Sequence, residues 1–342
     1  MGNSLKSYKI SFCTTCMDRL NHLRETLPDN ISGNEDYTQL EFVVLNYNSN
    51  DEMDKWMRAN QRVNIESGKI VYIKTTEPKY FKVAHAKNMA VRFATGDIVC
   101  NIDADNFTGK GFARYINEEF NNNPNIFLTA NQKGYSDLCG KVCVWKSDFS
   151  NVRGYDEKIL DYGYEDVDFY SRLKRIGRSE MKIKNSAYLQ SIKHGVLDRI
   201  KNGQYMQEIE FVLMQEIEHI IKAWVFKANK QFEHLIIHQQ NTTHPGHDKG
   251  GIIVNHGVWM AKENELECQY INIEKTVTLK SDNGGNSYNT TDGEYTRMPK
   301  IEACYQYSMI KGLMILNLND FHKGGINPDG FGQGQASVVR SF

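Results

Sequence analysis

The stretch Gly96-Asp-Ile-Val-Cys-Asn-Ile-Asp-Ala-Asp105 is a short apolar run that ends in two carboxylates, those of Asp103 and Asp105. Such a run is typical of a buried central strand in a parallel sheet. Carboxylates at the carboxyl end of that kind of strand lie where α/β sheets bind their ligands. Mg²⁺ and Mn²⁺ prefer oxygen ligands and commonly bridge carboxylates to phosphate groups. The stretch therefore predicts a metal site or, since aspartate is common in turns, a plain turn.

Strand-like and helix-like segments alternate on both sides of this run. The strand-like segments are 8–13, 40–45, 69–73, 98–102, 126–130 and 140–145. The helix-like segments are 20–27, 53–59, 84–93, 109–122 and 169–176. This alternation is typical of an α/β fold with a mostly parallel, doubly wound sheet. We therefore predict one such domain over residues 1–203.

The last third of the chain has less regular patterns. Apolar residues recur at helical spacing through Tyr205–Lys230, which predicts a long packing helix within residues 204–232. The glycine-rich end from Gly324 predicts a loosely ordered tail. Strand-like composition marks three further segments: 252–259, 266–279 and 309–318. We therefore expect residues 233–342 to form a mixed α+β appendage, whose role the sequence does not indicate.

Composition places the chain among globular proteins. Its 342 residues are 40% hydrophobic and 24% charged, and the formal net charge of −1 gives no indication of nucleic-acid binding. The polar N-terminus and the lack of an 18-residue apolar window argue against a signal peptide and a spanning helix. Seven scattered cysteines suit a reducing compartment. We expect a cytoplasmic protein, with peripheral association at the inner face of the membrane as an alternative.

A second acidic cluster follows in Asp161-Tyr-Gly-Tyr-Glu-Asp-Val-Asp168. Glu165 and Asp166 fall at the start of a predicted helix, a position that acidic residues favour in any protein. The same carboxylates could instead act as a general base toward an attacking hydroxyl. With a metal-bound diphosphate at the first cluster, this arrangement suits sugar transfer from a nucleotide sugar. Nucleotidyl transfer would use the first cluster equally well.

Four motifs stand in a defined order around these clusters. They are Phe81-Lys-Val-Ala-His-Ala-Lys-Asn88 with Gly96-Asp97, Gly140-Lys-Val-Cys-Val-Trp145 with Gly154-Tyr-Asp-Glu157, Gly163-Tyr-Glu-Asp-Val-Asp168, and Ile192-Lys-His194. Their order resembles the family 2 glycosyltransferases of the GT-A fold, in particular the galactosyltransferase-type members, including the β-1,4-galactosyltransferases. The resemblance covers roughly residues 8–200 and implies a Rossmann-like GT-A domain.

The resemblance implies a set of metal ligands. Asp105 would bind Mn²⁺ (or Mg²⁺) directly, and His194 would be a further ligand through a ring nitrogen. Asp103 would contact the ribose or assist the metal. Ser191 stands where those enzymes have a methionine ligand.

The resemblance also implies how the sugar is transferred. Asp166 would deprotonate an acceptor hydroxyl for in-line attack with inversion, and Glu165 would hydrogen-bond the acceptor or the donor sugar. Tyr162 and Tyr164 stand where the family stacks aromatic rings on the acceptor. The donor would be a UDP-sugar carrying galactose or an N-acetylhexosamine. The acceptor would be a glycan or a lipid-linked oligosaccharide, in the synthesis of a surface polysaccharide.

A further set of polar residues is placed for the nucleotide. Lys87 among them could neutralise a phosphate or simply be a solvated helix charge. Asn46 and Tyr47 stand where many family members have two acids. The predicted nucleotide and donor residues are Thr14, Thr15, Arg19, Asn46, Asn48, Asp51, His85, Lys87, Asn88 and Asp103.

Two other functions stay open at this point. A sugar nucleotidyltransferase would need a glycine-rich loop after the first strand, and Thr14–Arg19 contains no glycine. A catalytically silent carbohydrate-binding module would have no reason to keep Asp105, Asp166 and His194 together.

Histidines gather after the predicted long helix: His234, His238, His244, His247 and His256. The four-residue spacing of His234 and His238 suits zinc on a helix. No cysteine or glutamate stands in register with them, so we expect structural histidines. The sequence indicates no oligomeric state.

Overall fold

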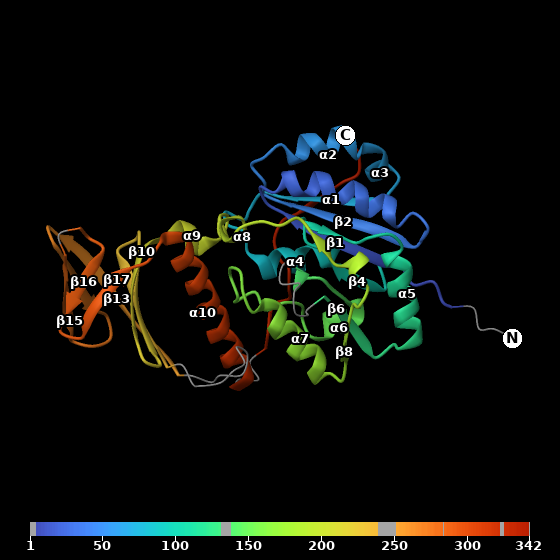
Figure 1. Cartoon of the computed structure of the whole chain (residues 1–342). Coiled ribbons are helices and arrows are strands. Elements are labelled where there is room, and N and C mark those ends of the chain that lie inside the picture. Colours follow the sequence, from blue (N-terminus) through green and yellow to red (C-terminus); the bar gives the residue numbers. More distant parts are fainter. Residues whose placement is uncertain (1–4, 131–137, 239–250, 283, 322–324, 342) are drawn as a thin grey trace. The chain divides into compact units, whose positions relative to one another are not determined.

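The chain folds into two compact units, each with its own sheet and core (Figure 1). The N-terminal unit comprises residues 1–195 and 323–342, and the barrel unit comprises residues 196–322. The computed structural model describes residues 5–130, 138–238, 251–282, 284–321 and 325–341.

An eight-stranded sheet forms the centre of the N-terminal unit (Figure 1). Its strand order is β18-β3-β2-β1-β4-β7-β6-β8. Neighbouring strands pair in parallel except where β7 and β18 run against their neighbours. The strands are β1 (Ile10–Cys16), β2 (Leu40–Tyr47), β3 (Ile70–Thr75), β4 (Ile98–Asn101), β6 (Ile126–Thr129), β7 (Val142–Trp145), β8 (Ser179–Lys182) and β18 (Ser337–Val339). The predicted mostly parallel α/β sheet is confirmed.

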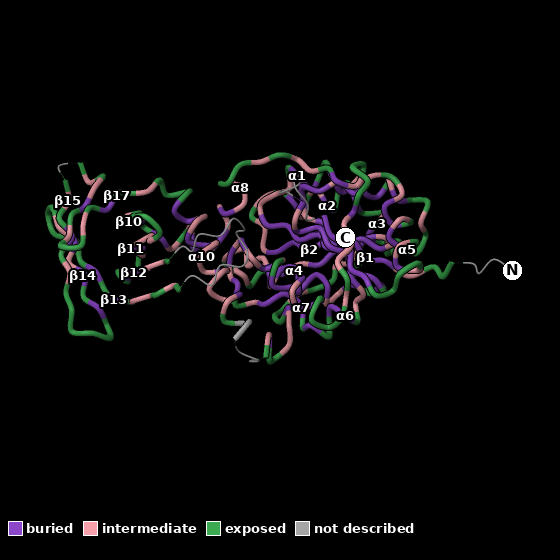
Figure 2. Tube along the Cα trace, turned by 60° about the horizontal axis from the view of Figure 1, so that its bottom comes forward, coloured by how far each residue is buried: buried purple, intermediate pink, exposed green. Residues whose placement is uncertain are grey.

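Helices cover both faces of this sheet, so its strands are buried (Figure 2). Alternate residues of a strand point to opposite faces. In β2, accordingly, Phe42 packs in one core and Val43 in the other. The first core holds α1 (Leu20–Gly33), α2 (Met53–Asn60), α3 (Arg62–Glu66) and α5 (Phe112–Asn122). The second core holds α4 (Val83–Phe93), α6 (Lys146–Asn151) and α7 (Glu165–Arg175).

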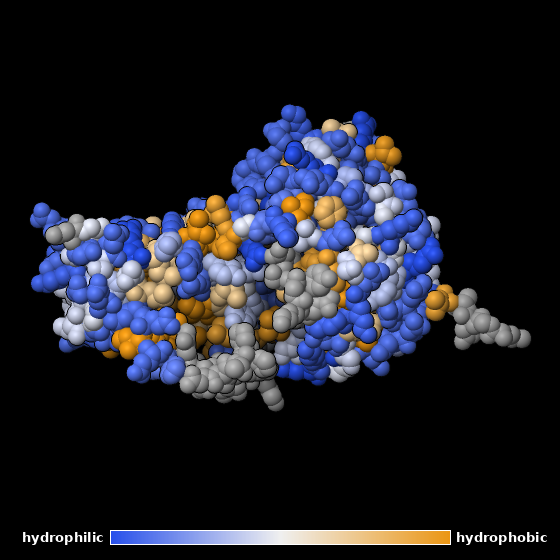
Figure 3. All heavy atoms as spheres, in the orientation of Figure 1, coloured by the Kyte–Doolittle hydropathy of each residue, from blue (hydrophilic) through white to orange (hydrophobic). Residues whose placement is uncertain are grey.

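The face of the N-terminal unit seen in Figure 3 is mainly hydrophilic. Its most exposed apolar side chains, such as Val63, Val167 and Ile176, are scattered along the sequence. Among the helices that the structure describes, none has the length and apolar composition needed to cross a lipid bilayer.

The barrel unit is built around a closed barrel of antiparallel strands. Aromatic side chains, including Trp224, Phe226 and Tyr295, fill its interior. The strands are β10 (Ile209–Ile217), β11 (Ile220–Lys227), β12 (Gln231–His238), β13 (Ile252–Lys262), β14 (Glu265–Tyr270), β15 (Thr276–Ser281), β16 (Ser287–Thr290) and β17 (Gly293–Arg297). The helices of this unit are α8 (Val196–Ile200), α9 (Gln204–Glu208) and α10 (Lys300–Phe321).

The predicted long helix at Tyr205–Lys230 is wrong, because most of this segment forms the β10–β11 hairpin. Both faces of these strands carry buried side chains: Leu213 and Trp224 point into the barrel core, while Val212 and Val225 are buried outside it. Burial on both faces replaces the two-residue alternation of a strand with a pattern that imitates helical spacing.

Other predictions for the appendage are corrected or refined by the barrel. Residues 309–318 were predicted as a strand but belong to α10, since a continuous apolar run has no period that separates the two structures. The strand predicted at 252–259 lies in β13, and the one at 266–279 covers parts of β14 and β15. The appendage is therefore an antiparallel barrel with short helices and α10, not a helical and mixed one.

The predicted loose tail is also wrong for the described residues after Gly324. Strand β18 pairs with β3 at the edge of the N-terminal sheet, and Asn327 is buried. Gly332 has φ +61°, and a β-carbon there would lie 2.6 Å from the Met89 nitrogen. This glycine therefore allows the segment to approach α4 closely.

The histidines lie on strands and not on a helix. His234 is buried inside the barrel, where Nδ1 is 2.8 Å from the Tyr270 hydroxyl and the ring stacks on Trp224. His238 ends β12 and His256 lies in β13, while His244 and His247 fall outside the described residues. In the parts of the chain described here, no three His, Cys, Asp or Glu side chains are grouped to hold a metal ion.

A buried carboxylate fastens α10 to the barrel. Glu233 on β12 accepts hydrogen bonds from the Tyr307 hydroxyl at 2.7 Å and the Lys227 ammonium at 2.7 Å, and Lys311 lies 3.3 Å away. Burial would raise the pKa of Glu233, but these partners outweigh it and lower the pKa to about 2. A carboxylate with a lowered pKa stabilises the fold above its unfolded pKa, and this contribution is lost as the pH falls through the folded value.

We therefore expect Glu233→Gln to lower the free energy of unfolding at neutral pH by about 3–5 kcal/mol, because two lysines lose a buried partner. The difference from wild type should shrink between about pH 4 and pH 2, as measured by urea denaturation. Glu302→Gln, which changes an exposed glutamate on α10, is the control and should be nearly neutral. A pH-independent difference would contradict the assignment.

Candidate active site

The first acidic cluster lies at the carboxyl end of β4, as the sequence predicts. Asp103 is half-buried and accepts a hydrogen bond from the Asn101 amide at 2.9 Å. Asp105 is buried, and its Oδ2 lies 2.7 Å from Nε2 of His194. The structure thus brings together two side chains that are 89 positions apart in the sequence.

A small second sheet produces this pairing. Strand β5 (Asn106–Phe107) pairs antiparallel with β9 (Gln190–Ser191), and the Ile192 amide donates to the Asp105 carbonyl at 2.9 Å. The chain after β9 therefore passes Asp105 and delivers His194 to its carboxylate. Ser191 takes part in this strand pairing with Asn106.

The two aspartates have opposite pKa shifts. Burial raises the pKa of Asp103, and the neighbouring charge of Asp105 adds to the effect. Burial also acts to raise the pKa of Asp105, but the hydrogen bond with His194 and the charge of Arg19 outweigh it and lower the pKa. The same hydrogen bond raises the pKa of His194. Asp105 is therefore the more acidic of the two carboxyl groups.

Sequence reasoning missed Lys141 at this cluster. Its buried ammonium donates to the Phe107 carbonyl at 2.8 Å and to the Tyr188 carbonyl at 2.7 Å. Burial lowers the pKa of Lys141 to about 8. Phe107 follows Asp105 and Tyr188 precedes β9, so Lys141 holds the two segments that carry Asp105 and His194. The feature that points to Lys141 is its complete burial, which cannot be read from the sequence.

The second acidic cluster lies at the amino end of α7. Lys87 of α4 is buried, and its ammonium contacts Glu165 Oε1 at 3.1 Å and Asp166 Oδ1 at 3.0 Å. Burial would lower the pKa of Lys87, but the charges of Asp166 and Glu165 raise it well above its usual value. Lys87 was predicted to neutralise a phosphate; in this structure its ammonium is paired with the two carboxylates.

Asp166 is poised to titrate near neutral pH. Burial raises its pKa to about 7, with a further contribution from Glu165, while Lys87 acts in the opposite direction. A base whose pKa lies near the working pH combines a large ionised fraction with good proton affinity. Glu165 is held in place by Lys87 and by the Gly163 amide at 3.1 Å.

The two clusters meet at Gly140. A β-carbon added there would lie 2.7 Å from Asp103 Oδ2 and 3.5 Å from Lys87 Nζ. Because Gly140 has no side chain, Asp103 of the first cluster and Lys87, which binds the carboxylates of the second, can both lie close to it.

The remaining predicted residues divide by location. Thr14 and Thr15 are buried at the end of β1, and Arg19 lies close enough to Asp105 to lower its pKa. Tyr162 and Tyr164 are half-buried in the loop before α7, and Tyr164 has φ +68° at the start of the helix.

Five predicted nucleotide residues have polar atoms engaged in holding loops. The contacts are Asn46 with Ser49 and Tyr72, Asn48 with Pro78, Asp51 with the Leu20 and Met53 amides, His85 with Tyr47 and Gln333, and Asn88 with Tyr155 and Glu157. The structure does not bring these side chains into the two carboxylate clusters.

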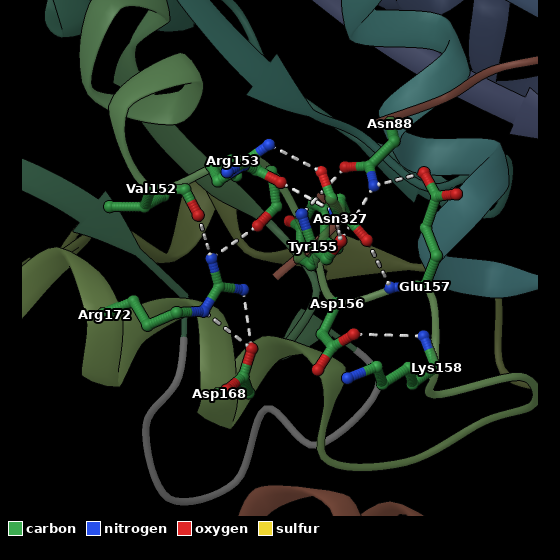
Figure 4. Close-up of polar contacts among 11 residues, drawn as sticks. Asn88, Val152, Arg153, Tyr155, Asp156, Glu157, Lys158, Asp168, Arg172 and Asn327 are labelled. Atoms are coloured by element: carbon green, nitrogen blue, oxygen red, sulfur yellow. Dashed lines mark hydrogen bonds and ion pairs between the residues drawn. The ribbon is translucent and has the colours of Figure 1, made fainter. Parts of the chain in front are cut away.

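Beneath α7, a polar network fixes the turn 152–157 (Figure 4). Arg172 pairs with Asp168 at 2.6 Å and donates to the carbonyls of Val152 at 2.5 Å and Gly154 at 2.6 Å. Asn88 exchanges two 2.8 Å hydrogen bonds with the Tyr155 main chain. These contacts join α4, the turn and α7 into one support for Lys87 and Asp166.

The profile of Glycosyl transferase family 2 matches residues 11–181. Among curated proteins, no sequence matches the chain.

Three solved structures illustrate the likeness. A Pyrobaculum calidifontis mannosyltransferase in complex with GDP-Man and Mn²⁺ is 17% identical (53% of this chain and 56% of that chain covered, TM-score 0.43). S. aureus TarS is 14% identical (53% and 59%, TM-score 0.44). The catalytic domain of Drosophila β1,4-galactosyltransferase 7 is 14% identical (58% and 75%, TM-score 0.39). The chain thus spans little more than half the length of the first two structures.

The Lys87 contacts give a prediction for stability. Lys87→Met leaves Glu165 and Asp166 buried beside each other without a cation, which should cost about 3–5 kcal/mol. The loss should be larger at about pH 8 than at about pH 6, because protonation of Asp166 at the lower pH relieves its repulsion with Glu165. Urea denaturation at both pH values measures it. Lys110→Met, an exposed change, is the control, and an equal loss at both pH values would contradict the prediction.

Proposed function

The chain belongs to Glycosyl transferase family 2, and from this premise we propose that it is an inverting, metal-dependent glycosyltransferase. It would move a hexose from a UDP-sugar to a hydroxyl group of a glycan acceptor. The observation that carries the proposal is the junction at Gly140, where Asp103 of the first cluster and Lys87, which binds Glu165 and Asp166 of the second, both lie close to one backbone position.

Asp166 supplies the base in this mechanism. Its carboxylate takes the proton of the acceptor hydroxyl as the acceptor oxygen bonds to the anomeric carbon of the sugar. The bond from that carbon to the diphosphate oxygen breaks on the opposite face, so the configuration inverts. Lys87 stays protonated and keeps Asp166 oriented, while Glu165 offers its second oxygen to a hydroxyl of the donor or acceptor.

The donors at the first cluster suit a hard divalent cation. Asp105 and His194 provide one carboxylate and one imidazole on adjacent segments, with Asp103 nearby, and Mn²⁺ or Mg²⁺ normally completes such a set with substrate phosphates and water. When bound there, the cation would stabilise the negative charge of the departing diphosphate.

The donor and acceptor classes rest on the four sequence motifs. These motifs favour galactose or an N-acetylhexosamine as the transferred sugar. A glycan or lipid-linked oligosaccharide of a surface polysaccharide is the acceptor we propose, with Tyr162 and Tyr164 offering aromatic faces to it.

UDP release from UDP-galactose, UDP-N-acetylglucosamine and UDP-N-acetylgalactosamine, with and without Mn²⁺, tests the proposal. We expect Mn²⁺-dependent release from at least one donor, because water can replace the acceptor. Asp105→Asn should weaken Mn²⁺-dependent UDP binding by more than about tenfold. Asp97→Asn, at the opposite end of β4, is the matched control and should not.

Failure to release UDP from all three donors would overturn the proposed donor class. Formation of pyrophosphate from UTP and a sugar phosphate would indicate nucleotidyl transfer instead. UDP binding without turnover of any donor would indicate a silent carbohydrate-binding module.

The pKa of Asp166 predicts the pH dependence of turnover. The carboxyl must be ionised to accept a proton, so the rate should rise with a midpoint near pH 7 and fall about tenfold per pH unit below it. Asp166→Asn should abolish transfer while UDP still binds, since the nucleotide lies at the other cluster. Loss of UDP binding in this variant, measured by calorimetry, would show that the base has been misplaced.

A further inference from the structure

The C-terminal segment returns to the N-terminal unit and inserts a buried asparagine into it. Asn327 Nδ2 donates to the carbonyls of Arg153 and Tyr155, both at 2.7 Å, and its Oδ1 accepts from the Glu157 amide at 3.2 Å. Figure 4 shows this side chain pointing into the turn 153–157. One side chain thus binds three main-chain groups of a turn that lies about 170 positions earlier.

The contact is reinforced from both sides. The Arg153 guanidinium donates back to the carbonyls of Asn327 at 2.9 Å and Pro328 at 2.7 Å. The Gly332 amide donates to Glu157 Oε1 at 2.5 Å. That same carboxylate oxygen accepts from the Asn88 amide at 2.8 Å, so Glu157 bridges the segment and α4.

The turn held in this way supports the base. The Tyr155 ring lies 4.9 Å from the Lys87 ammonium, and Lys87 in turn binds Glu165 and Asp166. Residues 158–164 lead from Glu157 to Glu165 and carry the two tyrosines proposed for the acceptor. One end of this loop is therefore anchored by Glu157, and the other by the pairing of Glu165 with Lys87.

The segment is fixed along its length to the same unit. Its main chain contacts three side chains of the N-terminal unit before β18 pairs with β3. The contacts are Gln333 O to His85 Nε2 at 2.6 Å, Gly334 O to Arg92 at 3.1 Å, and the Gln335 amide to Glu77 at 2.8 Å. Because the segment cannot shift without breaking several hydrogen bonds, it can hold the turn 153–157 in position.

We propose that Asn327 and Gly332 contribute to the transferase site, with Asn327 as a positioning residue for the loop 158–164 and for Asp166. This inference rests on the proposed function for its effect on turnover. It extends the site beyond the family-matched residues 11–181 to the far end of the chain.

Asn327→Ala tests the inference, with Asp329→Ala as the matched control because Asp329 is exposed two positions away in the same segment. Asn327→Ala should lower UDP release from the active UDP-sugar by about ten- to a hundredfold, because a shift of about 1 Å in a catalytic group has effects of this size. The affinity for UDP with Mn²⁺ should stay within about twofold of wild type, since the mutation is remote from Asp105. Asp329→Ala should change neither quantity.

Hydrogen exchange provides a readout that does not depend on activity. Amides of residues 155–166 should exchange faster in Asn327→Ala than in wild type, while β1 and β4 stay protected. If the wild-type enzyme releases no UDP, the proposed function fails, but this exchange experiment still tests whether Asn327 holds the loop 158–164 in position. Unchanged exchange and unchanged turnover would overturn the inference.

A second substitution covers the case in which Asn327→Ala does not fold. Gly332→Ala keeps every side chain of the network but places a β-carbon 2.6 Å from the Met89 nitrogen, which pushes the segment away from α4. It should give the same selective loss of turnover. An equal loss of UDP affinity and turnover in this variant would indicate general destabilisation and would overturn the positioning role.

Discussion

The site depends on one buried ammonium group. Lys87 comes from α4, and both of its carboxylate partners come from the first turn of α7, so this contact sets the position of one helix against the other. Two adjacent buried carboxylates would repel each other and bind protons, whereas a cation between them keeps at least one ionised. The favourable charge interaction has to offset a desolvation penalty of several kcal/mol per ion, so it depends on an accurately held geometry. Asn88, Arg172 and Asn327 help to hold this geometry, because their side chains donate hydrogen bonds to main-chain carbonyls of the turn that carries Tyr155.

Sequence patterns were sufficient for six of the eight strands of the N-terminal sheet but not for β8, β18 or the barrel, and the difference has a physical cause. Strands such as β1 and β2 are apolar segments separated by amphipathic helices, and that alternation has few other solutions. In the barrel unit, β10 and β11 bury side chains on both faces, so their sequence does not show the two-residue period of a strand. The second half of α10 contains the apolar run Leu313–Leu316, which fits a strand as well as a helix. The glycines after Gly324 were interpreted as flexibility, but Gly332 serves a close approach to α4. The need for a glycine at such a position depends on a segment that is distant in the sequence, so a local sequence pattern does not indicate it.

Some residues of the candidate site could likewise be predicted from the sequence, and others could not. Asp105, His194, Glu165 and Asp166 stand in motifs whose order could be read along the chain, and the structure places them in two adjoining clusters. Their chemical roles stay predictions. Lys141 could not be identified from the sequence, because its role depends on hydrogen bonds to two main-chain carbonyls. These belong to Phe107 in β5 and to Tyr188 shortly before β9. Asn46, Asn48 and Asp51 were assigned to the nucleotide by position alone, whereas their side chains cap or tie loops.

The site is assembled from segments on both sides of the barrel unit in the sequence. Asp105, Lys87 and Asp166 precede it, while Asn327 and β18 follow it, so the N-terminal unit is complete only when the last residues of the chain have docked. Contacts this distant in sequence require closure of a long loop before they contribute, and they form late for that reason. In the sequence, the barrel unit is therefore an insertion between two segments of the N-terminal unit.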